Sequence, residues 1–556
     1  MPRAVELVLE IEPNAASEWC DERAARSNSA NHHLDRPSVG SAVANALERS
    51  RDMAVTKPRE AITIRIVERR GRGERVVLEE WPDTRRVTVS HARPLSPGVT
   101  LRRTTRNVQL APGVPLTQSD AVPPDFKLGD SESDEWRPAP ALAAYCTGFQ
   151  WRGPDGRAVE IILLDALDTE ATQRDPAAPR GSARSGHWPA FCELRLSVLC
   201  DDGTLDVDKK SDVDASCDGA VKAAVSALFV AAHWLIERVP AFPVLIDVYA
   251  RATGDASGAE PVRATRVDLA GARTPHEAFV AIAGNVAQQW FGNECGARTS
   301  AQTEFVHQMR VALRRAKTLL KTFPRWVDDD WRTRVAPGFK WLGQILGEVR
   351  DGDVLVDSTL PMLINADTEP AAWSGIIAAA DAGRLEARDR LQQVLRSPRY
   401  AALSLAWLSW LAAHNFTAGP PELAQRSLAR YVAKRVRRRF ERLTAEPKLA
   451  SLDANGRHQR RIEAKRLRYT LEFFELLVAP GRRRNLARRL SRIQSVLGEV
   501  SDTVAAQRFL DDGGLAVTPY QRGFARGWGE AVNRSAAQEG ERLLGKLRKP
   551  KFTHRL

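Results

Sequence analysis

Two stretches of the sequence, 151 residues apart, place a histidine ahead of basic side chains at the same spacing. The first is VHQMRVALRRAKTLLKTF from Val306, and the second is RHQRRIEAKRLRYTLEFF from Arg457. Arginine binds phosphate oxygens in a bidentate way, lysine acts as a point charge, and a protonated histidine donates to the same oxygens. A mixed set of these residues favours a chain of phosphate groups over a planar base as the bound anion.

The repeat extends beyond the basic stretches. LGEVRD, from Leu346 to Asp351, matches LGEVSD, from Leu497 to Asp502, at the same offset of 151 residues. A repeat at one fixed offset indicates a duplicated structural unit. The sequence therefore predicts two copies of a helix pair, whose basic residues form a pseudo-symmetric set.

Helical periodicity places the basic residues of each copy on one face. At about 100° per residue, His307, Arg310, Arg314, Lys317 and Lys321 fall within a stripe roughly 80° wide. The second copy keeps this register. For a single stripe the alternative is a solvated helix face, and for each histidine it is a hydrogen-bonded structural role. Their repetition in register favours a shared binding site.

More basic residues gather on two other helical segments, LARYVAKRVRRRFERL and the run from Arg482 to Arg492. Uncompensated like charges on a helix repel each other, so several such helices indicate an anionic partner. The predicted phosphate-binding residues are the basic and histidine side chains of these repeats and of the first segment: His307, Arg310, Arg314, Arg315, Lys317, Lys321, Arg430, Lys434, Arg437, Arg438, His458, Arg461, Lys465, Arg466 and Arg468.

The charge of the chain is unevenly distributed. Residues 301–556 hold 46 Lys and Arg against 27 Asp and Glu, a net of +19, whereas the preceding residues hold 36 against 42, a net of −6. This asymmetry points to a localised polyanion site in the second half, since charge governs association rather than fold.

Motifs for catalysis or metal binding are missing from the sequence. It contains no phosphate-binding loop, dinucleotide fingerprint, nucleophile elbow or H-E-x-x-H motif. Its six cysteines have no metal-ligand spacing and read as reduced thiols. We therefore expect no catalytic residues, no metal and no cofactor. We also expect no secretion signal and no membrane span, and hence a cytoplasmic protein.

The elements that position these residues fall into two regions. Residues 1–250 alternate short β-like runs with polar loops, which is typical of an antiparallel sheet or barrel, and hold one helix over 220–238. Residues 251–274 read as a linker. From 275 to 551 the pattern is helical, with helices expected at 276–297, 301–323, 326–348, 372–396, 399–414, 420–444, 456–478, 482–500 and 518–546.

The two H-x-x-R-x-x-x-[RK]-R copies, each followed by LGEV-x-D, resemble the conserved histidine α-helical domain, or CHAD. The resemblance covers about 275–551. It implies two pseudo-symmetric helical bundles around a basic central cavity that binds inorganic polyphosphate.

The first 250 residues are similar to a CYTH domain, a β-barrel of the triphosphate tunnel type. Such enzymes hold a metal and phosphate with E-x-E-x-K on the first strand, and here Val8 or Pro13 interrupts that pattern. Leu78, Glu79 and Glu80 stand where a lysine is expected, and Arg195 follows Glu193 on a later strand. We expect a degenerate barrel without catalytic activity.

The fold class expected is thus α+β and multidomain, with an antiparallel barrel followed by an all-α domain. The favoured function is non-catalytic binding of inorganic polyphosphate, with a scaffold or granule-associated role. Two alternatives stay open, a metal-dependent triphosphatase acting through the barrel and a nucleic-acid-binding protein. Against nucleic acid, the stripes carry few aromatic side chains for base stacking.

Overall fold

The computed structural model divides the chain into two compact units. Unit 1 is Met1–Glu260 together with Leu395–Thr417, and unit 2 is Pro261–Val394 together with Ala418–Leu556. The described residues are 3–12, 39–69, 74–112, 122–123, 126, 136–139, 141–167, 191–200, 215–245, 260–424, 426–512 and 515–552.

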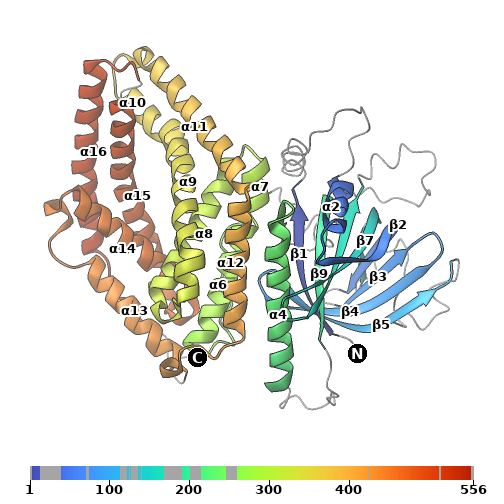
Figure 1. Ribbon diagram of the computed structural model, residues 1–556. Coiled ribbons are helices and arrows are strands. Elements are labelled where there is room, and N and C mark those ends of the chain that lie inside the picture. Colours follow the sequence, from blue (N-terminus) through green and yellow to red (C-terminus); the bar gives the residue numbers. More distant parts are fainter. Residues whose placement is uncertain are drawn as a thin grey trace. The chain divides into compact units, whose positions relative to one another are not determined.

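Unit 1 is built on a closed antiparallel barrel of eight strands (Figure 1). The strand order is β1-β5-β4-β3-β2-β7-β8-β9, and β1 closes the barrel by pairing with β9 as well as β5. Two short strands, β6 (Trp136–Pro138) and β10 (Ala241–Pro243), pair with β2 and β1. The barrel strands are β1 (Arg3–Ile11), β2 (Met53–Arg69), β3 (Glu74–Glu80), β4 (Arg85–Ser96), β5 (Val99–Leu110), β7 (Leu142–Arg152), β8 (Ala158–Ala166) and β9 (Phe191–Cys200).

Two helices that are far apart in the sequence pack against this barrel. Helix α4 (Ala215–Ile236) lies against β9 and against α12 (Pro398–Asn415), which also packs on β4 and β10. Helix α4 also packs on β1. Side chains alternate along this strand, so Val5, Leu7 and Leu9 are fully buried while the residues between them face the other side of the strand. A short helix, α2 (Val39–Glu48), packs on β2 and β8.

One described helix is long and apolar enough to cross a membrane by length and composition. It is α4, whose window Gly219–Ile236 has a mean hydropathy of 1.6 and is 56% buried in the structure. The core helix of a folded domain passes the same test, and α4 packs on a strand and a helix of its own unit.

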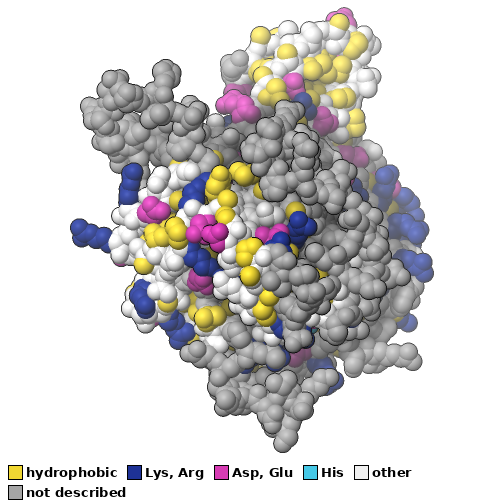
Figure 2. All heavy atoms as spheres, turned by 90° about the vertical axis from the view of Figure 1, so that its right-hand side faces the viewer, with side chains coloured by type: hydrophobic (Ala, Val, Ile, Leu, Met, Phe, Trp, Pro, Cys, Tyr) yellow, Lys and Arg dark blue, Asp and Glu magenta, His cyan; other side chains and the backbone are white. Residues whose placement is uncertain are grey.

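On the face shown in Figure 2, the described cationic and acidic side chains lie interspersed with apolar ones.

Unit 2 is helical throughout most of its length (Figure 1). The expected 326–348 segment comprises a π-helical turn, η3 (Trp331–Val335), and then α9, which continues into a second π-helical turn, η4 (Leu355–Thr359). The α-helices of the unit are α6 (Pro275–Phe291), α7 (Glu294–Thr299), α8 (Thr303–Thr322), α9 (Ala336–Val354), α10 (Leu360–Asn365), α11 (Ser374–Leu395), α13 (Leu428–Leu443), α14 (Ala454–Phe473), α15 (Pro480–Asp511) and α16 (Pro519–Gly545).

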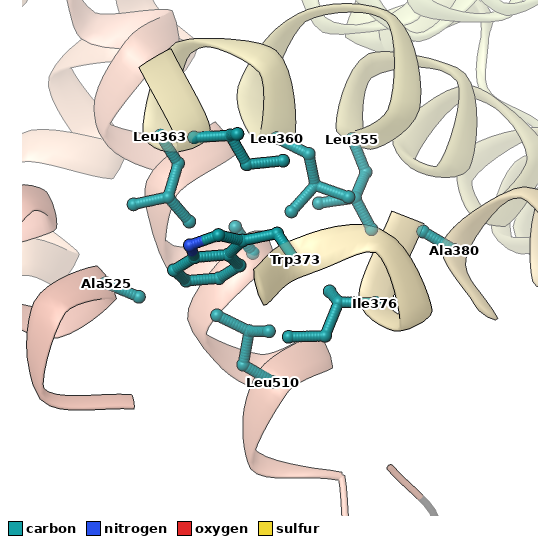
Figure 3. Packing of buried hydrophobic residues seen from close by; sticks show 10 residues of the cluster. Leu355, Leu360, Leu363, Trp373, Ile376, Ala380, Leu510 and Ala525 are labelled. Carbon is teal, nitrogen blue, oxygen red and sulfur yellow. The ribbon is translucent and has the colours of Figure 1, made fainter. Parts of the chain in front are cut away.

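The duplicated segments occupy equivalent places in unit 2. Copy one is α8 followed by α9, copy two is α14 followed by α15, and the copies meet where α8 packs on α14 and α9 on α15. Beyond them, Trp373 lies among leucines of η4, α10 and α15 and joins α11 and α16 to the same core (Figure 3). An antiparallel barrel followed by an all-α region of two related halves is therefore confirmed.

The division into units follows the chain less simply than the sequence suggested. The expected limits were 1–250 for the barrel, 251–274 for a linker and 275–551 for the helical domain. The structure groups Leu395–Thr417, which carries α12, with the barrel. Of the expected linker, residues 251–259 lie outside the described part of the chain.

Candidate anion-binding cavity

Helices α8 and α14 each present a buried apolar face and a cationic face. On α8, Met309, Leu313, Ala316 and Leu319 are buried in the core, which fixes the rotation of the helix. On α14, Ala464 and Leu467 are fully buried in the same way. The basic residues three and four positions away then lie together on the remaining face of each helix.

The two cationic faces line one cavity of about 1460 Å³ within unit 2. Twelve Lys and Arg side chains and two Asp side chains are among its lining residues. Nine of the fifteen predicted phosphate-binding residues line it: His307, Arg310, Arg314, Lys317, Lys321, His458, Arg461, Lys465 and Arg466. The geometry thus brings both copies of the histidine-led repeat to a single site.

Several of these cations have no internal counter-ion. In the part of the chain that the structure describes, Arg314, Lys317 and Lys465 have no carboxylate oxygen within 4.0 Å. Burial, with Arg314 and Arg461 nearby, lowers the pKa of Lys465 from 10.5 to about 6. Burial and the same kind of repulsion lower the pKa of Lys317. The cavity therefore holds cations that repel one another, and an anion would relieve this repulsion.

The two histidines lie at equivalent positions on the cavity lining. Burial lowers the pKa of His307, and the nearby Arg350 adds to this effect. Burial, Arg461 and Lys465 lower the pKa of His458. Both imidazoles are therefore neutral donors and acceptors near neutral pH, and become cationic only in more acidic solution.

Glycines of the LGEV-x-D motif face the arginines of α8 and α14. A Cβ atom added at Gly347 would lie 3.2 Å from Nη1 of Arg310, and one at Gly498 would lie 3.5 Å from Nη2 of Arg461. The missing side chain lets Arg310 Nη1 donate to the carbonyl oxygen of Gly347 at 2.7 Å. In copy one the motif thus joins α8 to α9 and sets the position of Arg310.

Residues 281–511 match the family described as the CHAD domain. A CHAD domain thus occupies 281–511, a range that includes Leu395–Thr417 of unit 1. This match lies within the range that the sequence motifs had indicated, and it confirms that resemblance. The search of curated proteins found no match.

Three solved structures are similar to part of this chain. The CHAD domain from the plant Ricinus communis is 29% identical with a TM-score of 0.45, over 53% of this chain and 100% of that chain. PptA from Streptomyces chartreusis is 17% identical with a TM-score of 0.38, over 50% and 99%. A Hippeastrum protein described as a putative adenylyl cyclase with a dominant triphosphatase activity is 11% identical with a TM-score of 0.23, over 46% and 96%.

Arg315 of the CHAD domain is a predicted site residue that does not reach the cavity. It is 1% exposed and donates to Gln289 at 2.6 Å and to Asn285 at 2.7 Å, both on α6. Its guanidinium also lies 5.3 Å from the ring centre of Phe473. Because its donors are directed into the core, Arg315 joins α8 to α6.

The other predicted residues outside the cavity lie on α13 and at the end of α14. Arg468 pairs with Glu472 at 3.3 Å and stacks on Tyr469. The α13 residues are exposed because Tyr431, Val432, Val436 and Phe440 bury the opposite face of that helix. The exposed α13 cations are Arg430, Lys434, Arg437 and Arg438.

Several cavity residues were not predicted from the sequence. Arg350, Asp351 and Asp502 belong to the repeated LGEV-x-D motif, and Arg457 directly precedes the second histidine, so the repeat itself held the signal. Arg332, Lys340 and Arg508 also line the cavity. They come from segments without a recognisable repeat, so only the packing of the helices shows that they line the cavity.

The barrel of unit 1 fits a CYTH-like tunnel, and its interior pairs acidic with basic residues. Strand register places Glu10 opposite Glu193 and Val8 opposite Arg195. Glu193 is 1% exposed and accepts from Arg195 at 2.5 Å, while Glu6 accepts from Arg102 at 2.8 Å.

Elsewhere inside the barrel, the core is apolar, with Ile62, Ile64, Leu142 and Leu164 packed together. The described residues hold no group of three or more His, Cys, Asp or Glu side chains that would bind a metal ion.

Proposed function

We propose that the cavity of the CHAD domain binds inorganic polyphosphate without cleaving it, and that the protein acts as a scaffold for this polymer in the cytoplasm, in association with polyphosphate granules. The observation that carries this proposal is the convergence of Arg314, Lys317, Arg461 and Lys465 from the two copies without carboxylate partners. A polymer with a negative charge on each phosphate matches cations that line two walls of one cavity.

The dimensions and lining of the cavity favour a thin, flexible polyanion. Its volume of about 1460 Å³ exceeds that of a typical small-molecule pocket, roughly 300–1,000 Å³. Single-stranded nucleic acid binds largely by stacking its bases on exposed aromatic rings. Here the cavity residues Trp331 and Phe339 are buried and pack edge to face at 5.0 Å, so these rings offer no open face for a base.

The test is a titration of the full chain with polyphosphate of defined length at one salt concentration. The triple variant Arg314→Gln, Arg461→Gln and Lys465→Gln should weaken binding by about a hundredfold or more, since each charge-assisted contact contributes roughly 1.5–3 kcal/mol. A matched control, Arg430→Gln, Lys434→Gln and Arg437→Gln on α13, also replaces two arginines and one lysine, but outside the cavity.

The control should change the affinity by less than about threefold, because these exposed cations do not line the cavity and salt screens charges at the surface. Equal losses in the two triple variants would contradict binding in the cavity. Competition with single-stranded and duplex DNA at the same salt concentration tests the alternative partner, and tighter binding of either DNA would overturn the assignment to polyphosphate. Phosphate release from tripolyphosphate in the presence of magnesium or manganese would contradict a non-catalytic role.

A further inference from the structure

The two LGEV-x-D motifs end in Asp351 and Asp502. Asp351 and Asp502 are the two acidic residues on the lining of a cavity that otherwise gathers cations. A carboxylate there repels a bound phosphate and competes with it for the same guanidinium groups. Because the aspartate is present in both copies, its interactions in each copy are compared below.

In copy one, the guanidinium of Arg310 is already occupied. Its Nη2 lies 3.2 Å from Oδ1 of Asp351, and its Nη1 donates to the carbonyl oxygens of Gly347 at 2.7 Å and Leu346 at 3.3 Å. The Asp351 side chain is 62% exposed, whereas that of Arg310 is 18% exposed. The arginine is thus fixed by α9, while the aspartate is free to turn toward solvent.

In copy two, the equivalent arginine lacks this arrangement. Among the described residues, Asp502 has no cation within 4.0 Å, and Arg461 has no carboxylate within that distance. Nε of Arg461 is buried without a hydrogen-bond partner in the described chain. Lys465 and Arg314, which line the cavity beside it, also lack counter-ions. Asp502 still acts on Arg461 through space, but only in copy one does the aspartate lie within ion-pair distance of its arginine.

We propose that Asp351 is an internal counter-ion of Arg310 that a phosphate must displace, so that the cavity has one open and one occupied anion subsite. The open subsite is formed by Arg461, Lys465 and Arg314, and it holds the first phosphates. The occupied subsite at Arg310 opens only when a longer chain reaches it and Asp351 turns away. This inference rests on the proposed function and concerns the order and strength of binding at the same site.

Competition of this kind predicts a gain of affinity when the aspartate loses its charge. Asp351→Asn should bind long-chain polyphosphate roughly three- to tenfold more tightly than the natural protein, as expected for removing a partly exposed ion-pair partner. Glu348→Gln is the matched control. It lies on the same helix, removes one negative charge, and breaks a pair with Arg390 at 3.2 Å outside the cavity lining. Its affinity should stay within about twofold of the natural protein.

A double variant separates competition from simple repulsion. If Asp351 acts through Arg310, its gain disappears in an Arg310→Gln background, so Arg310→Gln/Asp351→Asn should bind no more tightly than Arg310→Gln alone. If Asp351 only repels phosphate through space, the gain persists in that background. Asp351 lies on the surface of α9, so the single variant keeps the inference testable even where Arg310→Gln fails to fold.

Orthophosphate and long-chain polyphosphate are the two probes. Asp351→Asn should leave the weak binding of orthophosphate unchanged, since one phosphate occupies the open subsite. The inference is overturned by an Asp351→Asn protein that binds the polymer no more tightly than Glu348→Gln, or by a gain that survives without Arg310. A natural protein that binds no polyphosphate at all would instead overturn the proposed function.

Discussion

Lys465 shows how the surroundings of one residue couple anion binding to protons. Burial and the neighbouring Arg314 and Arg461 lower its pKa to about 6, so in the empty cavity it is largely neutral at pH 8. A bound phosphate favours the charged ammonium form and raises that pKa again. Above pH 6, binding therefore takes up a proton, and affinity depends on pH.

We predict that affinity for polyphosphate rises as pH falls from about 9 to about 6 and then levels off with respect to Lys465, because the cost of protonating it disappears near its pKa in the empty cavity. His307 and His458, whose pKa values are also lowered, add a further gain below their ordinary range. Titrations at fixed salt across this range measure the effect.

Lys465→Arg is the control for this prediction, because arginine stays charged throughout the range. The variant should bind with a flatter dependence on pH. A dependence on pH that is identical in the two proteins would show that Lys465 does not take up the proton.

Arg315 and Arg466 occupy the same position in the repeat, yet only Arg466 lines the cavity. The spacing of the basic residues predicted that they share one face of their helix, because residues three or four apart lie on the same side of an α-helix. It could not predict that Asn285 and Gln289, on a helix some distance away in the chain, would accept from Arg315. Partners from other helices decide which cations remain available.

Replacing Arg315 by alanine should lower the free energy of unfolding by about 2–4 kcal/mol, because it leaves the buried Gln289 without a donor. Arg314→Ala, one position away, removes a cation without such partners and should cost much less. Denaturant unfolding measures both. A stable Arg315→Ala protein with weakened polyphosphate binding would show that Arg315 contacts the ligand after all.

At the scale of elements, helix existence followed from periodicity while helix ends depended on packing. The segment expected at 420–444 forms a helix only from Leu428, after a 3₁₀ turn at Pro421–Leu423. The segment expected at 482–500 continues to Asp511, so Gly498 lies inside α15. There it faces Arg461, since a Cβ atom added at Gly498 would lie 3.5 Å from Nη2 of that arginine.

Trp373 should contribute strongly to the packing of the elements behind the cavity. It is fully buried among Leu360, Leu363 and Leu510 (Figure 3). Its Nε1 donates to Asp367 at 2.9 Å. Trp373→Ala should cost about 3–5 kcal/mol of stability in denaturant unfolding, as large cavities in a core do. Ile377→Ala removes a side chain that is 41% exposed and should cost little. Equal effects would mean that this cluster does not stabilise the unit.

At the scale of the whole molecule, the sequence indicated a barrel followed by a helical domain but not the exchange of α12 between them. Its segment lies between two helices of unit 2 and has helical spacing, so a reading along the chain assigned it to the helical domain. In the structure, Leu405 and Leu408 of α12 are fully buried, Tyr400 lies 6.5 Å from Phe242 between ring centres, and Arg396 pairs with Glu12. Only the three-dimensional contacts reveal that α12 completes unit 1.

The segment 261–556 produced alone should therefore expose the apolar surface of α12, which packs on α4, β4 and β10 in the full chain. We expect this fragment to bind a hydrophobic dye and to self-associate more than the full chain, as measured by fluorescence and light scattering. Replacing residues 395–417 with a Gly/Ser linker of the same length should abolish both effects. Polyphosphate affinity should persist in the linker form, because every residue that lines the cavity lies in 261–394 or 418–556. If the fragment that contains α12 stays monomeric and does not bind the dye, the apolar surface of α12 does not need unit 1 to cover it.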